Sequence, residues 1–194
     1  MKERYTRSFE VAAIIPQGDE HIIEGRAIHY NTPAFIRGEG SEGKFVEWYE
    51  VIDPQVLSNC DMRDVPLLLE HDTKDVIART RNKSLQLENR SDGLYIKAKM
   101  TTSKGREVWE SVRAGLRTSM SFAFPVEGTK KARDGTHEGV PIIRITAIKK
   151  LFDVAVVLNP AYEGAFANAR SADLVDSMLH RERTKQKIMI LLEE

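Results

Sequence analysis

Residue types that serve as nucleophile, base and orienting acid in acyl-transfer enzymes stand out at Ser121, His71 and Asp153 of this 194-residue chain. Ser121 lies in the run Ser-Met-Ser-Phe-Ala-Phe, residues 119–124, where small and bulky side chains alternate. This period of two predicts a strand that carries Ser121 on a face of small residues, with room for a substrate backbone. On the pattern alone, an ordinary strand serine is the simpler interpretation.

His71 directly follows the apolar run of residues 65–69 and Glu70. Such a run is typical of a buried strand, in which Leu67, Leu69 and His71 would share one face. A histidine at the mouth of an apolar strand can act as a general base at neutral pH. A half-buried histidine with local hydrogen bonds is the alternative. The other histidines have less suggestive settings: His21 and His29 in an early strand, His137 in a loop and His180 near the C-terminus.

Asp153 interrupts the otherwise apolar run of residues 151–158. A carboxylate in such a strand is costly to bury unless a group such as a histidine N–H or an arginine pairs with it. An edge strand with Asp153 facing water fits the pattern equally well. The chain order of histidine, serine and acid decides nothing, because this constellation recurs on unrelated folds in different orders.

Composition narrows the function classes. Lys plus Arg and Asp plus Glu both number 29, so no overall basic field favours binding to nucleic acid or to a membrane. The single cysteine, Cys60, permits neither an intramolecular disulfide nor a cysteine-rich zinc cluster and fits a reducing compartment. The charged residues 1–10 do not resemble a signal peptide, and no apolar run reaches the ~20 residues of a membrane helix. We therefore expect a cytosolic protein.

Most of the chain predicts short strands. We expect them over residues 9–15, 21–30, 45–52, 65–69, 84–88, 94–100, 119–126, 142–148 and 151–158. An amphipathic helix is predicted from Ser103 as its N-cap to Gly115 as its stop. A short helix is expected over residues 53–60, and loops over 31–43 and 128–139.

The composition changes at Ser171. A helix with an apolar face is predicted there, followed by the basic residues 181–187 and the apolar residues 188–192. We therefore divide the chain into one domain, residues 1–170, and a helical C-terminal tail, residues 171–194, outside the core.

Together these stretches resemble the prohead proteases of tailed bacteriophages, which are distantly similar to the herpesvirus assemblin proteases. The resemblance is carried, in order, by residues 7–10, 25–33, 50–54, 65–72, 77–80, 92–95, 119–124, 151–157 and 159–162. Ser119, Ala123 and Ala78 stand where the family usually has glycine, and Asp153 where glutamate is more frequent.

The resemblance implies an α+β, mainly β fold, an assemblin-like antiparallel β-barrel flanked by helices, with residues 1–170 as the protease domain. It also implies Ser121 as the nucleophile, with Ser119 as the fallback, and His71 as the base. For the third member we favour Asp153. The rivals Glu70 and Asp72 flank His71 and, in an extended strand, should point away from it.

The implied activity is serine endopeptidase cleavage of the scaffolding segment of the major capsid protein, and of the chain itself, inside the assembling prohead in the host cytoplasm. Partners would be the capsid protein and further copies of this chain, without nucleic acid or membrane. No metal or organic cofactor is implied. Two alternatives remain open: an inactive protease-fold scaffold or assembly chaperone, and a small β-barrel module that binds peptide or nucleic acid.

Overall fold

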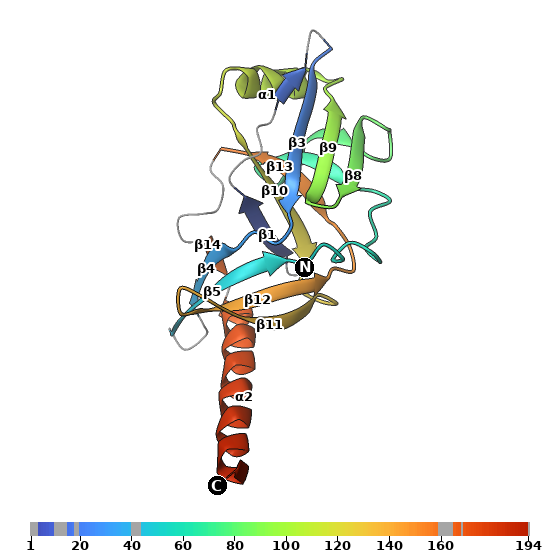
Figure 1. Ribbon diagram of the computed structural model, residues 1–194. Helices are drawn as coiled ribbons and strands as arrows, with labels where there is room; N and C mark the ends of the chain where they lie inside the picture. Colours follow the sequence, from blue (N-terminus) through green and yellow to red (C-terminus); the bar gives the residue numbers. More distant parts are fainter. Residues whose placement is uncertain are drawn as a thin grey trace.

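The protein is built mainly from β-strands. A computed structural model describes residues 4–9, 15–17, 20–39, 44–158, 165–167 and 169–193. Strands account for 52% of the chain, and two helices complete the described part. The strands form three sheets (Figure 1). The expected α+β, mainly β class is therefore confirmed.

The first sheet joins strands from distant parts of the sequence in the order β1-β10-β13-β6-β7. Its members are β1 (Arg4–Phe9), β6 (Pro66–Leu69), β7 (Asp72–Arg79), β10 (Ser119–Pro125) and β13 (Asp153–Val157). β13 runs antiparallel to β10 and parallel to β6. Every residue of β10 and β13 is buried, as expected for central strands that are covered on both faces.

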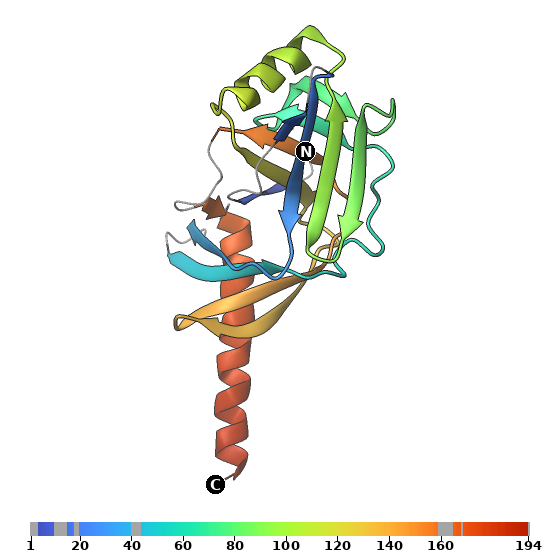
Figure 2. The same cartoon turned by 45° about the horizontal axis from the view of Figure 1, so that its top comes forward.

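Two further sheets complete the body. One has the order β11-β12-β5-β4-β14 and the other β2-β3-β9-β8. The former consists of β4 (Ala34–Glu39), β5 (Phe45–Ile52), β11 (Lys130–His137), β12 (Val140–Ala147) and β14 (Ala165–Ala167). The latter consists of β2 (Ile15–Gln17), β3 (Ile22–His29), β8 (Leu85–Arg90) and β9 (Gly93–Lys99). Figure 2 shows the second sheet nearest to the C-terminal helix and the third sheet along one side of the body.

The expected closed antiparallel barrel is not found among the described strands. A barrel requires every strand to be hydrogen-bonded on both sides, whereas each of these sheets ends in two edge strands. Three pairings are parallel: β13 with β6, β12 with β5, and β14 with β4. The three open sheets are instead joined through their side chains, which bury one common hydrophobic core.

The two faces of the first sheet differ in the way that the alternation along β10 predicts. Met120, Phe122 and Phe124 enter the main core, and the rings of Phe122 and Phe124 stack with centroids 5.5 Å apart. The opposite face carries Ser121, which lies directly across from Ala155 of β13. The sheet therefore turns its bulky residues inward and keeps small residues around the serine.

Helix α1 (Ser103–Arg113) leads into β10. Thr102, one residue before the expected cap, is its N-cap, and the Thr102 hydroxyl accepts a hydrogen bond from the Gly105 N–H at 3.1 Å. Gly115 ends the helix with φ of 72°, and the Leu116 N–H bonds the Ser111 carbonyl in a Schellman motif. The predicted helix and its glycine stop are confirmed.

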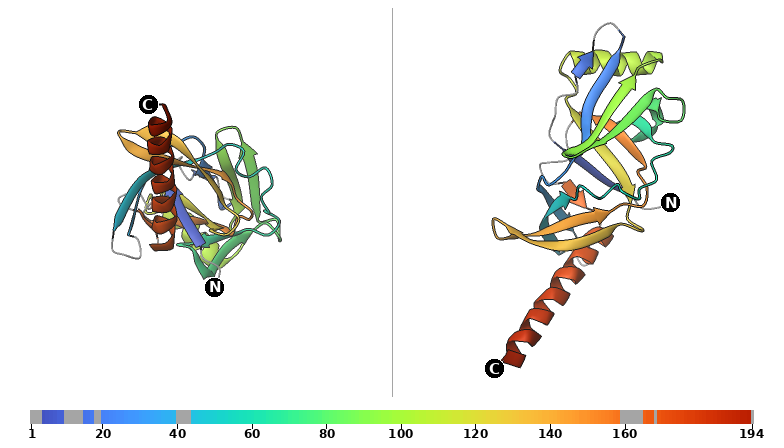
Figure 3. Two further views of the ribbon diagram at one scale, coloured as in Figure 1. Left: turned by 90° about the horizontal axis from the view of Figure 1, so that it is seen from below. Right: turned by 45° about the vertical axis from the view of Figure 1, so that its right-hand side comes forward.

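Helix α2 (Ala169–Glu193) begins two residues before Ser171 and projects beyond the body, at the end opposite α1 (Figures 1 and 3). Its 25 residues correspond to a length of about 37 Å. Val175 and Leu179 are buried in the main core, whereas Ile188 and Met189 are more than half exposed. The tail is thus anchored by its first turns, and the rest of the helix extends away from the sheets (Figure 1).

This anchoring predicts a stability difference along α2. Leu179→Ala removes a side chain that is only 6% exposed, so we expect it to lower the free energy of unfolding by about 2–4 kcal/mol. Met189→Ala, at a position 62% exposed, should change it by less than about 0.5 kcal/mol. Urea denaturation of both variants measures the difference. Equal effects at the two positions would show that the start of α2 is not part of the core.

Three local expectations were wrong. Residues 53–60 form consecutive turns rather than a helix, because hydrogen bonds such as Val56 N–H to Asp53 C=O span three residues. The expected loops over residues 31–43 and 128–139 contain β4 and β11. β11 is an edge strand with mostly exposed residues, so it lacks the hydrophobic alternation that marks a half-buried strand. Within the expected strand 9–15, residues 10–14 lie outside the described ranges.

Candidate active site

Ser121 lies in the middle of β10, between β1 and β13. Its Cα partners are Ser8 on β1 and Ala155 on β13. The residue has no exposed surface. The hydroxyl is therefore held on a central strand, where it faces other groups of the protein instead of solvent.

His71 occupies the two-residue turn between β6 and β7, not the extended strand predicted from the sequence. Leu69 pairs with Asp72, so Glu70 and His71 are the two central residues of the hairpin turn. Both have positive φ, 51° and 59°, as in a type I′ turn. Glycine or asparagine usually fills such positions, and for other residues the left-handed conformation costs about 1–2 kcal/mol each. The candidate base is therefore presented by a strained turn.

Asp153 is the first residue of β13 and lies directly across from Ala123 of β10. Ala123 and Ser121 are on the same face of their strand, so Asp153 and Ser121 also share a face. The Asp153 side chain is only 1% exposed. The alternative of an edge strand with this aspartate in water is therefore excluded, and the carboxylate has the partner that its burial requires.

That partner is His71. Nδ1 of His71 lies 2.6 Å from Oδ1 of Asp153, and Nε2 of the same ring lies 2.5 Å from Oγ of Ser121. An ionised carboxylate can only accept a hydrogen bond, so Nδ1–H donates to Asp153 and the Nε2 lone pair accepts the Ser121 O–H. The three side chains form one continuous row in which a proton can pass from the hydroxyl to the imidazole.

Strand order explains how residues so far apart in the sequence meet. β10, β13 and β6 are consecutive in the first sheet. β10 carries the hydroxyl, β13 begins with the carboxylate, and the turn that follows β6 carries the imidazole. The three side chains therefore come from neighbouring strands of one sheet.

The rival assignments have other partners. The His71 ring bonds Oγ of Ser121, although Ser119 is equally buried two residues earlier on β10. The Glu70 carboxylate accepts the N–H of Leu158 at 2.8 Å. Oδ1 of Asp72 accepts the N–H of Lys74 at 2.9 Å. Neither flanking carboxylate occupies the place beside the imidazole that Asp153 fills.

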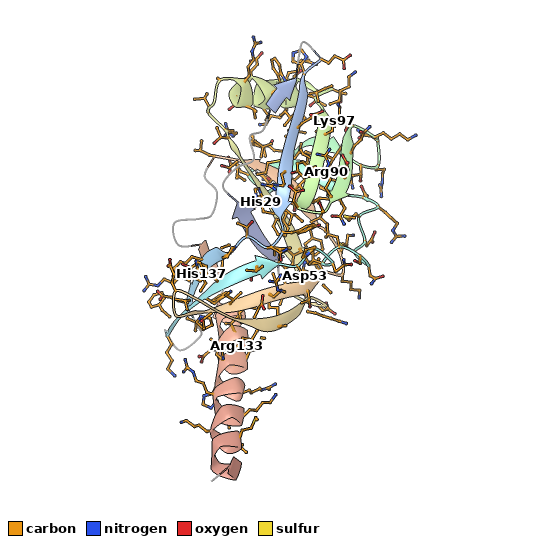
Figure 4. All side chains as sticks on the ribbon, in the orientation of Figure 1. His29, Asp53, Arg90, Lys97, Arg133 and His137 are labelled. Carbon is orange, nitrogen blue, oxygen red and sulfur yellow. The ribbon has the colours of Figure 1, made fainter. Side chains whose placement is uncertain are left out.

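The remaining histidines lie elsewhere. His29, near the end of β3, and His137, beside the β4–β5 pair, are labelled in Figure 4, well apart from one another. His137 packs edge-on against Tyr49 with ring centroids 4.5 Å apart. His21 packs against Trp109 on α1 at 4.7 Å, and His180 is exposed on α2. The ring contacts of His21 and His137 involve aromatic residues and not Ser121.

His29 gives a pH prediction for stability. Burial, aided by the neighbouring Arg26 guanidinium, lowers the pKa of His29 from 6.5 to about 4. The folded state thus binds this proton less readily than the unfolded state does, so the stability present above pH 6.5 is lost as the pH falls towards 4. The full effect is about 3 kcal/mol. In urea unfolding, His29→Gln should lose less stability than wild type between pH 7 and pH 4, and equal losses would contradict the assignment.

The residues that the structure describes contain no group of three or more His, Cys, Asp or Glu side chains arranged to hold a metal ion. Neither of the described helices has the length and apolar content needed to cross a bilayer.

The residue types at positions 70 and 71 do not predict the turn that presents His71. Type I′ turns are recognised by Asn-Gly or Asp-Gly pairs, and here the pair is Glu-His. The spacing is the relevant feature: β6 ends at Leu69, and β7 begins at Asp72 after only two intervening residues. Hairpins with two-residue loops have this spacing.

Comparison with known proteins gives one match. No curated protein and no solved structure matches the chain. A family model does match, over residues 7–180, and its description is caudovirus prohead serine protease. The matched region contains all three residues of the hydrogen-bonded row and ends one residue after Leu179, which is buried in the core. Because this match covers most of the chain, the protein belongs to the caudovirus prohead serine protease family, the hydrolases of bacteriophage capsid maturation.

Proposed function

We propose that the protein is a serine endopeptidase in which Ser121 is the nucleophile, His71 the general base and Asp153 the residue that orients the base. The observation that carries this proposal is the hydrogen-bonded row, with 2.5 Å from Ser121 to His71 and 2.6 Å from His71 to Asp153. Family membership supports the reaction class. The roles follow from the chemistry of the three groups.

In the proposed mechanism, Nε2 of His71 takes the Ser121 proton as Oγ attacks the carbonyl carbon of the scissile peptide. Asp153 keeps Nδ1 protonated, so that Nε2 is free to accept, and stabilises the imidazolium that forms. The imidazolium then gives its proton to the leaving amine, and water hydrolyses the acyl-enzyme with His71 again as base. Backbone N–H groups would stabilise the oxyanion, at about 3–4 kcal/mol per donor.

The burial of Ser121 restricts how a substrate can reach the proposed site. Ser121 has no exposed surface, while the His71 side chain is 18% exposed, so a peptide must approach from the histidine side. A carbonyl carbon cannot come within bonding distance of Oγ without some opening of the site. Family membership, rather than this burial, supports the place of cleavage, which we propose to be the assembling prohead.

The proposed substrate is the scaffolding segment of the major capsid protein, and the chain itself is a second one. Beyond Leu179, residues 180, 181, 183–185 and 187–189 of α2 are exposed. A cut in this stretch would leave Val175 and Leu179 in place. The protease domain would then be the body together with these first turns of α2, slightly longer than the expected residues 1–170.

Co-expression with the capsid protein tests the proposal. Wild type should trim the capsid protein to a shorter product, detected by mass spectrometry, and Ser121→Ala should not. If wild type leaves the capsid protein intact while proheads still assemble, the protein acts as a protease-fold assembly chaperone instead.

A further inference from the structure

Glu70, the neighbour of the candidate base, makes contacts that tie the site together. Its Oε1 accepts the N–H of Leu158 at 2.8 Å and lies 3.4 Å from Nε of Arg117. Its own backbone N–H donates to the carbonyl of Val156 at 3.0 Å. One residue therefore has three contacts outside its own hairpin, which is unusual for the middle of a two-residue turn.

These contacts reach each of the segments that carry the triad. Glu70 is bonded through the chain to His71. Arg117 lies four residues before Ser121, in the connection from α1 to β10. Leu158 follows β13, the strand that begins with Asp153. The Glu70 carboxylate thus links the base-bearing turn to the ends of the nucleophile strand and of the acid strand.

Arg117 is also held by a hydrogen bond to helix α1. Its Nη1 donates to Oγ of Ser111 on α1 at 3.0 Å, and the side chain is only 26% exposed. Nε is buried and makes no hydrogen bond that meets ordinary geometry, so the Glu70 carboxylate is its nearest ionic partner. The guanidinium is therefore a fixed anchor rather than a mobile surface charge.

The turn needs such an anchor because Glu70 and His71 both have positive φ. A strained conformation persists only where the surrounding structure over-determines it. Without the Glu70 contacts, only the closure of the β6–β7 hairpin would hold these dihedral angles, and the turn could shift relative to β10. The imidazole would then leave the position in which Nε2 lies 2.5 Å from Oγ of Ser121.

We propose that Glu70 is a positioning residue, which through Arg117 and the Leu158 N–H holds the His71 turn in register with Ser121. This inference rests on the proposed function. An ion pair this exposed contributes little to global stability. A displacement of about 1 Å at a reacting group can nevertheless cost about 100-fold in rate. The signature of positioning is thus a large loss of kcat with little change in KM or in thermal stability.

Three substitutions at position 70 separate the possible roles. Glu70→Ala loses the carboxylate, and we expect kcat to fall about 10- to 100-fold with KM unchanged. Glu70→Gln keeps the length and the oxygen that accepts the Leu158 N–H, so it should retain more activity than Glu70→Ala. Glu70→Asn is the sharpest variant, because asparagine tolerates positive φ better than glutamate but is one methylene too short to reach Leu158 and Arg117.

The rates are measured with the full chain against the purified scaffolding segment of the capsid protein, below the thermal transition of every variant. Glu70→Asn should be slower than wild type but faster than Glu70→Ala, because it relieves the strain at position 70 without restoring the contacts to Leu158 and Arg117. Arg117→Ala should also be slow, and the Glu70→Ala/Arg117→Ala double variant no slower than the worse single one, since the two residues act as a unit. Glu88→Gln, which breaks an exposed ion pair with Arg90 on another sheet, is the matched control and should equal wild type.

The outcomes also separate this inference from the proposed function. If wild type shows no cleavage that depends on Ser121, both are overturned. If wild type cleaves through Ser121 and Glu70→Ala matches its kcat, the turn needs no anchor and only the role of Glu70 is wrong. A fall in activity that follows the melting temperature of each variant, with full activity when cooled, also overturns positioning, because it reports unfolding.

Discussion

Replacement of Ser121 by alanine is expected to leave the capsid protein uncut, with kcat lowered by about 10⁴- to 10⁶-fold. The substitution removes only Oγ, the atom that lies 2.5 Å from the His71 ring. The backbone of β10 continues to pair on both sides through its own N–H and C=O groups. The fold should survive while the nucleophile is lost. Product formation is followed by mass spectrometry of co-expressed capsid protein.

Ser119→Ala is the matched control. Ser119 lies two residues earlier on the same strand, is just as buried and loses the same single atom. We expect it to process the capsid protein at nearly the wild-type rate, because the His71 ring bonds Ser121 instead. The reverse result, an inactive Ser119→Ala and an active Ser121→Ala, would move the nucleophile to position 119.

Asp153→Asn is expected to reduce kcat by about 10³- to 10⁴-fold while leaving the protein folded. Asparagine has nearly the same shape as aspartate, but its amide lacks the charge that stabilises the imidazolium. Its NH₂ group also favours the tautomer in which Nδ1 is unprotonated and Nε2 carries the proton, and that Nε2 cannot accept the Ser121 O–H. Single-turnover rates and circular dichroism together separate a chemical defect from unfolding.

The control for Asp153→Asn is Asp72→Asn. Asp72 is adjacent to His71 in sequence, yet its exposed carboxylate caps the Lys74 N–H on β7. We expect Asp72→Asn to retain wild-type processing. An inactive Asp72→Asn beside an active Asp153→Asn would reassign the orienting acid to the rival position.

The sequence predicts which residue types the site contains better than it predicts how they are arranged in space. An aspartate within an apolar strand has to find a polar partner, and Asp153 is indeed buried against His71. The small face around Ser121 followed from the alternation along residues 119–124. Neither pattern predicts the distances that join Ser121, His71 and Asp153. These arise because β13 inserts between β10 and β6, a pairing between strands far apart in the chain.

The missed features share a physical cause. β4 and β11 are strands because β5 and β12 supply their hydrogen bonds, not because their own residues favour extended structure. The positive φ of His71 comes from the closure of the β6–β7 hairpin and not from the preference of histidine. In each case the structure depends on pairing with another strand, which the pattern of the residues themselves does not contain.

The place of β13 in the sheet also controls when the site can exist. β13 is the last-synthesised strand of its sheet, yet it lies at the sheet's centre, between β10 and β6. Until the ribosome has released residues 153–157, the earlier strands lack both the acid and the neighbour that joins them. Synthesis at about 5–20 residues per second therefore delays completion of the proposed site, and a chain that ends before residue 153 lacks both the proposed orienting acid and the central strand of this sheet.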